Sequence, residues 1–382
     1  MSPSKDPAPT PSNEPAPDRR GYMLGESRVA QLTVRARSFL PAMADSADDT
    51  LILASPNLLG VSRAEIYLTS RCNLACRYCN SRHRSEPPWP SGRLEALIDT
   101  LAATGTRHIQ WTGGEATVDP ALPQLVARAT ALGMDSSIST NGTASPTTYD
   151  ALVQAGMGRF YISLDLIDGG AFDRETGSRG MLQRVRDNIA LLCDLPDDQR
   201  PHVTVNSILD PNTTRTLMAN GGHALRRLLG WCQDTGVDDF KFLPASRARL
   251  VTIFEDEGSW EDFESLCRHE VPADYSMFHY RMRTMRAGGH GLPAGRPHPC
   301  WLCLDDRAFD SQHAYPCIVR LREGAQPLYR HTDDTHTKLA ATTEFLAQDR
   351  ARDPICRAHC YDLYRELSQA VTTRLQGHGL PG

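Results

Sequence analysis

The sequence has no apolar run that approaches the roughly 20 residues of a membrane-spanning helix, and its start lacks the basic-then-apolar order of a signal peptide. It also has no excess of positive charge, since 41 Lys and Arg face 46 Asp and Glu, for a net charge of −5. Wholesale disorder is excluded because 40% of the 382 residues are hydrophobic. We therefore expect a cytoplasmic protein with neither a membrane nor a nucleic acid as partner.

Cysteine is the residue whose count is informative. The chain has 11 cysteines, an odd number that argues against a disulfide framework in a protein that is not exported. Three of them lie close together before residue 80, and five lie between residues 300 and 360. Clusters of this kind indicate metal binding or redox chemistry.

Short β-branched runs alternate with helical patterns in the first two thirds of the chain. This alternation predicts βαβ units and an α/β fold with a parallel sheet. Six units are too few for a closed eight-stranded barrel, so we expect a partial (β/α)6 TIM-type barrel with its site at the carboxyl ends of the strands. The expected strands are residues 64–69, 108–112, 135–140, 160–165, 202–209 and 239–244.

The rest of the chain is divided around that barrel, which we place at residues 62–246. Residues 1–20 are rich in Pro, Ser and Ala and are expected to be a disordered tail. Residues 21–61 form an N-terminal lead-in. Residues 247–299 show no clear period and are expected to be an irregular linker that contributes to the substrate site, and residues 300–375 are expected to form a small iron–sulfur domain.

The first cysteine group follows directly after the first expected strand. Cys72, Cys76 and Cys79 are separated by three and then two residues. Three thiolates at this spacing hold one corner of a [4Fe–4S] cluster and leave its fourth iron open to a small chelating molecule. A structural zinc site is the alternative, but zinc prefers four ligands in paired CxxC units. The spacing therefore favours iron–sulfur.

This CxxxCxxC spacing resembles the radical S-adenosylmethionine (SAM) superfamily, as do Thr112-Gly-Gly-Glu115 after the second strand and the ends of later strands, over about residues 62–246. The resemblance implies that the cluster binds SAM, that an electron from a reductant such as flavodoxin or ferredoxin cleaves SAM, and that the 5′-deoxyadenosyl radical removes a substrate hydrogen. By the same match the residues that contact SAM are Tyr78, Gly113, Gly114, Glu115, Ser163 and Asn206. For Ser163 and Asn206 the alternative is a polar group satisfied at a strand end.

The second cysteine group has a C-x2-C-x13-C pattern formed by Cys300, Cys303 and Cys317. It resembles the auxiliary cluster of the GTP 3′,8-cyclase family and of the related twitch and SPASM domains. A fourth ligand is available from either Cys356 or Cys360. Zinc is again the alternative, but the radical-SAM-like barrel upstream favours a second, auxiliary [4Fe–4S] cluster.

The resemblance to the cyclase family fails where GTP would bind. The basic residues that contact GTP in that family fall on Glu65, Gln110, Thr204 and Asp305, which are acidic or neutral. A triphosphate beside new carboxylates is unfavourable, which argues against GTP. We expect Glu65 and Asp305 to border the substrate and to bind its amino groups.

The leading hypothesis is thus a radical SAM enzyme that oxidises, cyclises or epimerises an amino-bearing small molecule or peptide. Cys267, in an expected helix, is a candidate donor that returns a hydrogen atom to the product radical, with an apolar core position as its alternative. The alternative functions are pterin-precursor synthesis from GTP and, from another class, a zinc-stabilised interaction module without chemistry.

Overall fold

The computed structural model describes residues 26–44, 59–79, 81, 84–245, 253–254, 257–286, 291–293, 295 and 297–379. The expected disordered tail and part of the expected lead-in lie outside these ranges. None of the described helices is long and apolar enough to cross a bilayer.

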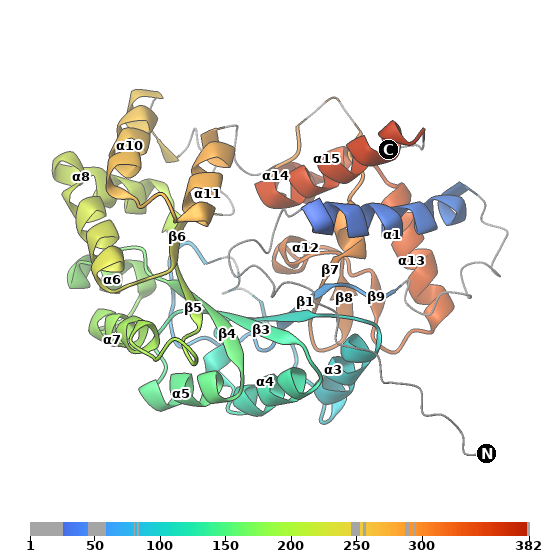
Figure 1. Ribbon diagram of the computed structural model, residues 1–382, viewed down its shortest axis with the longest axis horizontal. Coiled ribbons are helices and arrows are strands. Elements are labelled where there is room, and N and C mark those ends of the chain that lie inside the picture. The colour runs from blue at the N-terminus through green and yellow to red at the C-terminus, as the bar shows by residue number, and fades with distance from the viewer. Residues whose placement is uncertain are drawn as a thin grey trace, which may run out of the picture.

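Six parallel strands form the expected partial barrel and follow one another in the sheet in the order β1 to β6. Neighbouring strands pair in parallel throughout, and the sheet does not close on itself. The prediction of an open α/β barrel is therefore confirmed (Figure 1). The strands are β1 (Arg63–Tyr67), β2 (His108–Thr112), β3 (Asp135–Thr140), β4 (Met157–Ser163), β5 (His202–Leu209) and β6 (Asp239–Pro244).

Helices lie on the outer face of this sheet, and their apolar sides pack against it (Figure 1). In α3, Leu94, Ile98 and Leu101 are buried, as their spacing of four and three residues requires. The apolar core of the barrel thus lies between sheet and helices, which leaves the concave face to polar side chains. The helices are α3 (Arg93–Ala103), α4 (Leu122–Ala131), α5 (Pro146–Gln154), α6 (Gly169–Thr176), α7 (Leu182–Cys193) and α8 (Pro211–Asp234), with a 3₁₀ turn at Ala116–Val118.

The segment 247–299 is more regular than its sequence predicted. It contains the helix expected around Cys267, α10 (Glu257–Glu270), and a second helix, α11 (Ser276–Arg286), for which the expectation of an irregular linker is wrong. Charged and aromatic residues in these helices obscure the helical period. Phe263 and Phe278 nevertheless pack around Phe242 of β6 and bury the helices against the barrel.

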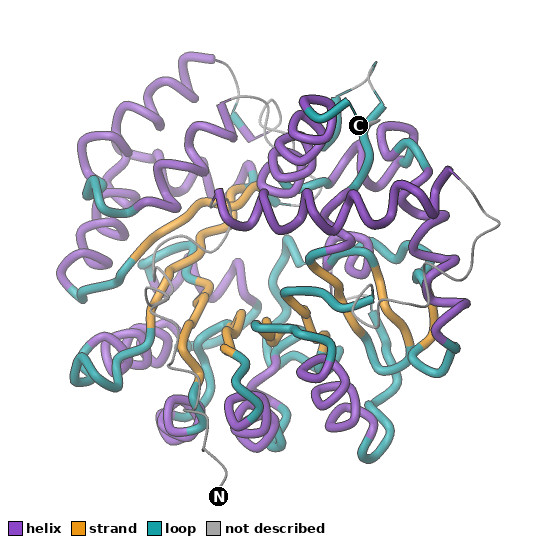
Figure 2. The backbone as a smooth tube through the Cα atoms, turned by 45° about the vertical axis from the view of Figure 1, so that its right-hand side comes forward, coloured by secondary structure: helices purple, strands orange, loops and turns teal. Residues whose placement is uncertain are grey.

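The C-terminal part extends the same sheet. Strand β7 (Asp306–Phe309) pairs in parallel with β1, and β8 (His313–Tyr315) and β9 (Tyr329–Arg330) continue it in antiparallel fashion. Helix α1 (Glu26–Ala44) packs on α15 (Asp362–Gly377), and Figures 1 and 2 show both above the C-terminal strands. The remaining elements are Trp301–Leu304 (3₁₀), α12 (Ile318–Arg322), α13 (Thr335–Ala347), Arg350–Arg352 (3₁₀), α14 (Pro354–His359) and α15 (Asp362–Gly377).

A buried charge network joins the two parts of the sheet. The Arg63 guanidinium on β1 donates to Glu65 at 2.7 Å and to Asp306 on β7 at 2.5 Å. Arg63 is 8% exposed and Asp306 is fully buried, so neither charge has water to replace its partner. The network therefore ties the barrel to the C-terminal domain.

Replacing Arg63 by Met should lower the free energy of unfolding by about 3–5 kcal/mol, because it leaves two buried carboxylates without their cation. Urea denaturation of the anaerobically purified protein measures this change. Arg128→Met is the matched control, since Arg128 forms an exposed pair with Asp99 and its loss should alter stability little. Equal midpoints for the two variants would contradict a stabilising role for the network.

Candidate functional site

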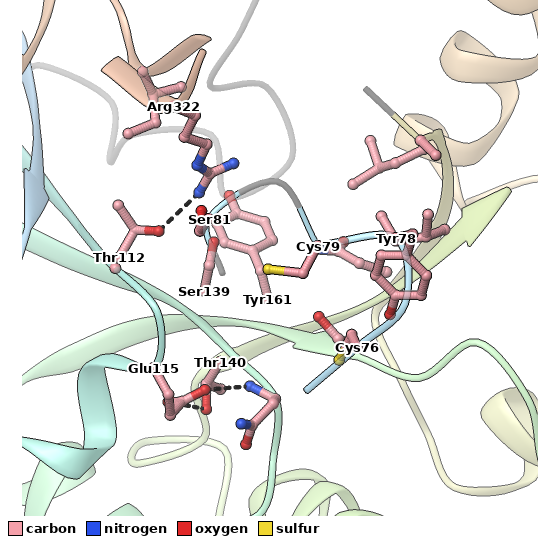
Figure 3. Close-up of a pocket in the computed structure, with 18 of the residues that line it drawn as sticks. Cys76, Tyr78, Cys79, Ser81, Thr112, Glu115, Ser139, Thr140, Tyr161 and Arg322 are labelled. Atoms are coloured by element: carbon pink, nitrogen blue, oxygen red, sulfur yellow. Dashed lines mark hydrogen bonds between the residues drawn. The ribbon is translucent and has the colours of Figure 1, made fainter. Parts of the chain in front are cut away.

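The loop after β1 brings the first cysteine group to the carboxyl end of the barrel. Cys72, Cys76 and Cys79 all line one pocket of about 320 Å³, and none forms a disulfide (Figure 3). The loop is fixed from the far side of the pocket, where the Ala75 and Arg77 amides donate to carbonyls at the end of α6 at 2.9 Å. The three thiols therefore sit on a loop with a defined backbone path.

Gly113 and Gly114, which follow β2, fit closely against this loop. A Cβ on Gly113 would lie 2.4 Å from the Thr69 carbonyl oxygen, and one on Gly114 would lie 2.5 Å from that of Arg71. The Gly114 amide donates to Thr69 at 2.7 Å. The glycine pair is thus required for packing against the cysteine loop, in addition to lining the pocket.

Glu115 is held by the protein itself. Its carboxylate accepts hydrogen bonds from the Thr117 amide and hydroxyl, from Thr140 Oγ1 at 2.8 Å and from the Asn141 amide at 2.7 Å. Burial raises the pKa of Glu115, and these hydrogen bonds oppose that shift. The carboxylate therefore joins the ends of β2 and β3, and Figure 3 shows Glu115 beside Thr140.

Three further residues expected to contact SAM line the same pocket, namely Tyr78, Ser163 and Asn206. Ser163 and Asn206 are register partners on β4 and β5. Asn206 Oδ1 is buried without a hydrogen-bond partner among the described residues, so it is not a satisfied strand-end group. Tyr78 donates to Asp165, whose other oxygen accepts from the Ile208 amide at 2.6 Å. Burial raises the pKa of Asp165 to about 7.

These residues fit a cluster with a polar ligand beside it. Three free thiols, the glycine edge and the unsatisfied Asn206 oxygen all face one cavity. In the part of the chain that the structure describes, no three His, Cys, Asp or Glu side chains converge as one metal ion requires. A four-iron cluster holds its thiolates farther apart than a single tetrahedral zinc ion does. The three thiols on one loop therefore suit an iron–sulfur cluster with an open iron.

The second cysteine group draws its members from three segments of the C-terminal domain. Burial raises the pKa of Cys360, and the nearby thiols of Cys300, Cys356 and Cys317 raise it further. Burial and the nearby Cys300 thiol raise the pKa of Cys303, which lies together with Cys317 in the apolar core beneath α15. The structure thus brings cysteines of three separate segments toward one region of the C-terminal domain.

The two carboxylates expected at the substrate lie in different places. Glu65 lines the pocket and accepts hydrogen bonds from Arg63 and, at 3.1 Å, from the Tyr364 hydroxyl. Asp305 is not among the residues that line the pocket and pairs with Arg28 of α1 at 2.5 Å. The expectation that Asp305 faces the substrate is wrong, because its side chain points toward α1.

Cys267 also lies away from the pocket in which a hydrogen-atom donor would be needed. It is completely buried in α10, within the core between the helices and the barrel, and it does not line the pocket. The structure supports its alternative, an apolar core position.

Several pocket residues were missed by the sequence analysis. Lys241 of β6, Arg281 of α11 and Arg322 of α12 line the same cavity as the cysteines. Lys241 had a signal that could have found it, because Asp239, Lys241 and Leu243 share one face of their strand and Lys241 pairs with Asn206. Arg281 and Arg322 come from helices whose packing the sequence does not reveal.

Comparison with known proteins agrees with this geometry. Residues 66–216 match the family model of the Radical SAM superfamily. Residues 66–216 are a radical SAM domain. Enzymes of this superfamily bind SAM and a [4Fe–4S] cluster.

The most similar curated proteins include several enzymes. A GTP 3′,8-cyclase of Chlorobaculum tepidum is 39% identical over 119 residues, which cover 29% of this chain and 35% of that enzyme. An AdoMet-dependent heme synthase of Nitratidesulfovibrio vulgaris is 26% identical over 59% of this chain and 62% of its own length. A PqqA peptide cyclase of Xanthomonas axonopodis is 35% identical over 31% of this chain and 33% of its length. The match to the cyclases thus spans little more than a third of their length.

Solved structures extend the similarity to the C-terminal part. Streptococcus suis SuiB bound to its precursor peptide SuiA has a TM-score of 0.54 at 14% identity, over 81% of this chain and 73% of SuiB. The enzyme anSMEcpe with bound AdoMet has a TM-score of 0.53 at 14% identity, over 84% of this chain and 97% of its own. At this identity the likeness concerns the fold.

Gly114→Ala should remove the first cluster while the fold persists, because the added Cβ would collide with the Arg71 carbonyl and displace the cysteine loop. Iron and sulfide analysis after anaerobic purification should show about half of the wild-type content, as expected when one of two clusters is lost. Gly158→Ala is the control, since its Cβ would lie 3.7 Å from the nearest atom. Full iron content in Gly114→Ala would show that the close approach is not needed.

Proposed function

We propose that this protein is a radical SAM enzyme that reductively cleaves SAM and removes a hydrogen atom from a peptide or another amino-bearing small molecule. The observation that carries the proposal is the pocket itself, in which three free thiols of one loop face polar strand ends of the barrel. A cluster held by Cys72, Cys76 and Cys79 would supply, through its open iron, the electron that converts SAM to a 5′-deoxyadenosyl radical. The outcome is oxidation, cyclisation or epimerisation of the substrate.

The surrounding residues bind SAM and fix the elements that hold it. The Gly113–Gly114 backbone and Asn206 Oδ1 line the pocket as acceptors that suit the SAM ammonium or its ribose hydroxyls. Ser163 offers a hydroxyl on the neighbouring strand. Tyr78 and Asp165 bind each other across the pocket and fix the end of the cysteine loop against β4 and β5. Glu115 has an indirect role in this proposal, because it fixes the strand ends on which the other groups lie.

We assign a second, auxiliary [4Fe–4S] cluster to the C-terminal domain, with Cys300, Cys317, Cys356 and Cys360 as its ligands. This set is supported by Cys360, because the thiols that act on it most strongly are those of Cys300, Cys356 and Cys317. Both candidates for a fourth ligand are then used, and full ligation by protein suits a cluster that exchanges electrons rather than one that binds substrate. Tyr361, next to Cys360, lines the pocket and so brings this cluster near the substrate.

A peptide is the substrate that the comparisons favour. PqqA peptide cyclase acts, by its name, on a peptide, and SuiB is bound to a precursor peptide. The role of Glu65 in binding an amino group is weakened by its contacts with Arg63 and Tyr364. Pterin-precursor synthesis from GTP is the second candidate, supported by the 39% identity to a cyclase over 119 residues but opposed by the absence of the family's basic positions at Glu65 and Asp305.

We further infer that the protein works in the cytoplasm with a reductant such as flavodoxin or ferredoxin. All 11 cysteines are free in the structure, which suits a reducing compartment. A zinc-stabilised interaction module remains the competing function from another class, and metal analysis distinguishes it, since such a module would contain zinc and no iron.

Replacing Cys72, Cys76 and Cys79 together by Ala should leave a folded protein that retains one cluster and forms no 5′-deoxyadenosine. Anaerobic reconstitution followed by chromatography of SAM incubated with dithionite measures this. The matched control is Cys193→Ala, which removes a half-buried thiol of α7 that does not line the pocket and should leave SAM cleavage intact. Cleavage by the triple variant would show that the active cluster lies elsewhere.

Cys300→Ala and Cys356→Ala should each lose the auxiliary cluster, whereas Cys303→Ala should keep it. The reason is that Cys303 fills an apolar site, so its loss leaves only a small cavity. Iron content and electron paramagnetic resonance of the reduced protein distinguish the two outcomes. Loss of the cluster in Cys303→Ala with retention in Cys356→Ala would restore the ligand set that the sequence pattern indicates.

A further inference from the structure

The charges that line the pocket are unevenly paired. Among the described residues, four cationic side chains and three carboxylates line it. Each carboxylate already has partners: Glu65 has Arg63 and Tyr364, Glu115 has the strand-end donors, and Asp165 has Tyr78 and the Ile208 amide. No pocket carboxylate therefore needs a substrate ammonium.

Two of the four cations are also paired. Arg63 is held by Glu65 and Asp306, and Arg281 by the buried Asp362. The remaining two cations are Lys241 and Arg322, for which no carboxylate within hydrogen-bonding distance is found in the described part of the chain. The charge of Glu65 acts on both side chains, but Glu65 pairs directly with Arg63. Lys241 and Arg322 therefore have no direct ion pair of their own and are available for an anion from outside.

Lys241 and Arg322 approach the same region from different elements. The Lys241 Nζ atom lies 4.2 Å from the centre of the Tyr161 ring of β4, on which it makes a cation–π contact. Arg322 reaches down from α12, donates to Thr112 Oγ1 at 2.8 Å and has a buried Nε without a partner. Figure 3 shows its guanidinium pointing into the pocket toward Ser139 and Tyr161.

The surroundings of Lys241 disfavour its charge when the pocket is empty of anions. Burial, together with the charges of Arg281 and Arg63, lowers the pKa of Lys241 to about 7 against the opposing effect of Asp239 and Glu65. The oxygens of Asp239 are already bound by the Phe240, Met277 and Phe278 amides. An entering anion would restore the ammonium form and gain an ion pair in a site of low dielectric constant.

We propose that Lys241 and Arg322, which line the same pocket as Tyr161, form an anion site that binds a carboxylate of the substrate, so that the substrate is an acidic peptide. This inference rests on the proposed radical SAM function and names the substrate class for it. Its chemistry is the reverse of the amino-group recognition expected from Glu65 and Asp305. A carboxylate suits the site better than a triphosphate, because two unpaired cations beside three carboxylates cannot balance the several charges of a triphosphate.

The sequence makes a direct test practical, because Lys5, Lys241 and Lys338 are its three lysines. Acetylation of each lysine by acetic anhydride can be followed separately by mass spectrometry on the anaerobic holoenzyme. The probes are an acetylated, amidated tripeptide with a central glutamate, its glutamine counterpart, and GTP. The glutamate peptide should protect Lys241 but not Lys338, because a bound carboxylate both covers the amine and keeps it protonated.

The glutamine peptide should need about a ten- to hundredfold higher concentration for equal protection, since it lacks the charged hydrogen bonds. Arg322→Gln should raise the concentration of glutamate peptide needed for protection by a similar factor. Arg128→Gln, which changes an exposed arginine of α4, should leave that concentration unchanged. Calorimetric titration of Lys241→Met with the same peptides gives an independent reading that needs no reactive lysine, and it should show the same loss of affinity.

Equal binding of the glutamate and glutamine peptides, or no binding of either, would overturn the anion site. Stronger protection by GTP than by the glutamate peptide would also overturn it and restore the cyclase interpretation. Formation of 5′-deoxyadenosine by the wild type, measured on the same preparation, decides the proposed function separately. SAM cleavage without selective peptide binding would support the radical SAM function and overturn the anion site. Selective peptide binding without SAM cleavage would support the anion site and overturn the radical SAM function.

Discussion

The parallel pairing of β1 with both β2 and β7 is the constraint on which the rest of the site depends. The last residues of β1 lead into the cysteine loop, and its edge against β7 fixes the start of the C-terminal domain. Arg63 on β1 binds Asp306 on β7, so the same strand also carries the charge that joins the two parts. A displacement of β1 would therefore move both cysteine groups and the pocket wall between them.

The concave face of the barrel buries polar side chains, and hydrogen bonds among them offset the free-energy cost of removing them from water. His108, Ser137 and Gln110 form a buried chain, with 2.7 Å from His108 Nε2 to Ser137 Oγ and 2.6 Å from that hydroxyl to Gln110. Burial lowers the pKa of His108 well below its usual value, and the nearby Arg63 adds to this, so the ring is neutral. A neutral network fills the space under the pocket without adding to its charge. The pocket charges are therefore those of the side chains at its wall, and these come from strand ends and from the C-terminal helices.

The sequence predicts features that depend on local spacing. The bounds of β2, β3, β5 and β6 agree with the expected strands, because their β-branched runs end at turn residues that the chain itself supplies. The CxxxCxxC loop and the Gly113–Gly114 turn were predictable for the same reason. Contacts between distant segments were not. The side to which Asp305 points depends on Arg28, 277 positions earlier, and the approach of Cys356 to Cys300 depends on how the C-terminal segment packs.

The same distinction explains why the expected chemistry of the substrate changed sign. Basic positions lost from a family pattern can be read from aligned residues, and their loss made Glu65 look like an unpaired acid. Whether an acid is paired depends on contacts in the folded protein. Tyr364, 299 positions later in the chain, donates a hydrogen bond to Glu65, and Arg63 donates to the same oxygen. Arg322 enters the pocket only because β7 and β8 place α12 above the end of β2, where Thr112 receives its guanidinium. The charge of this pocket thus depends on both domains. A barrel without the C-terminal domain would lack Arg322, one of the two cations of the proposed anion site.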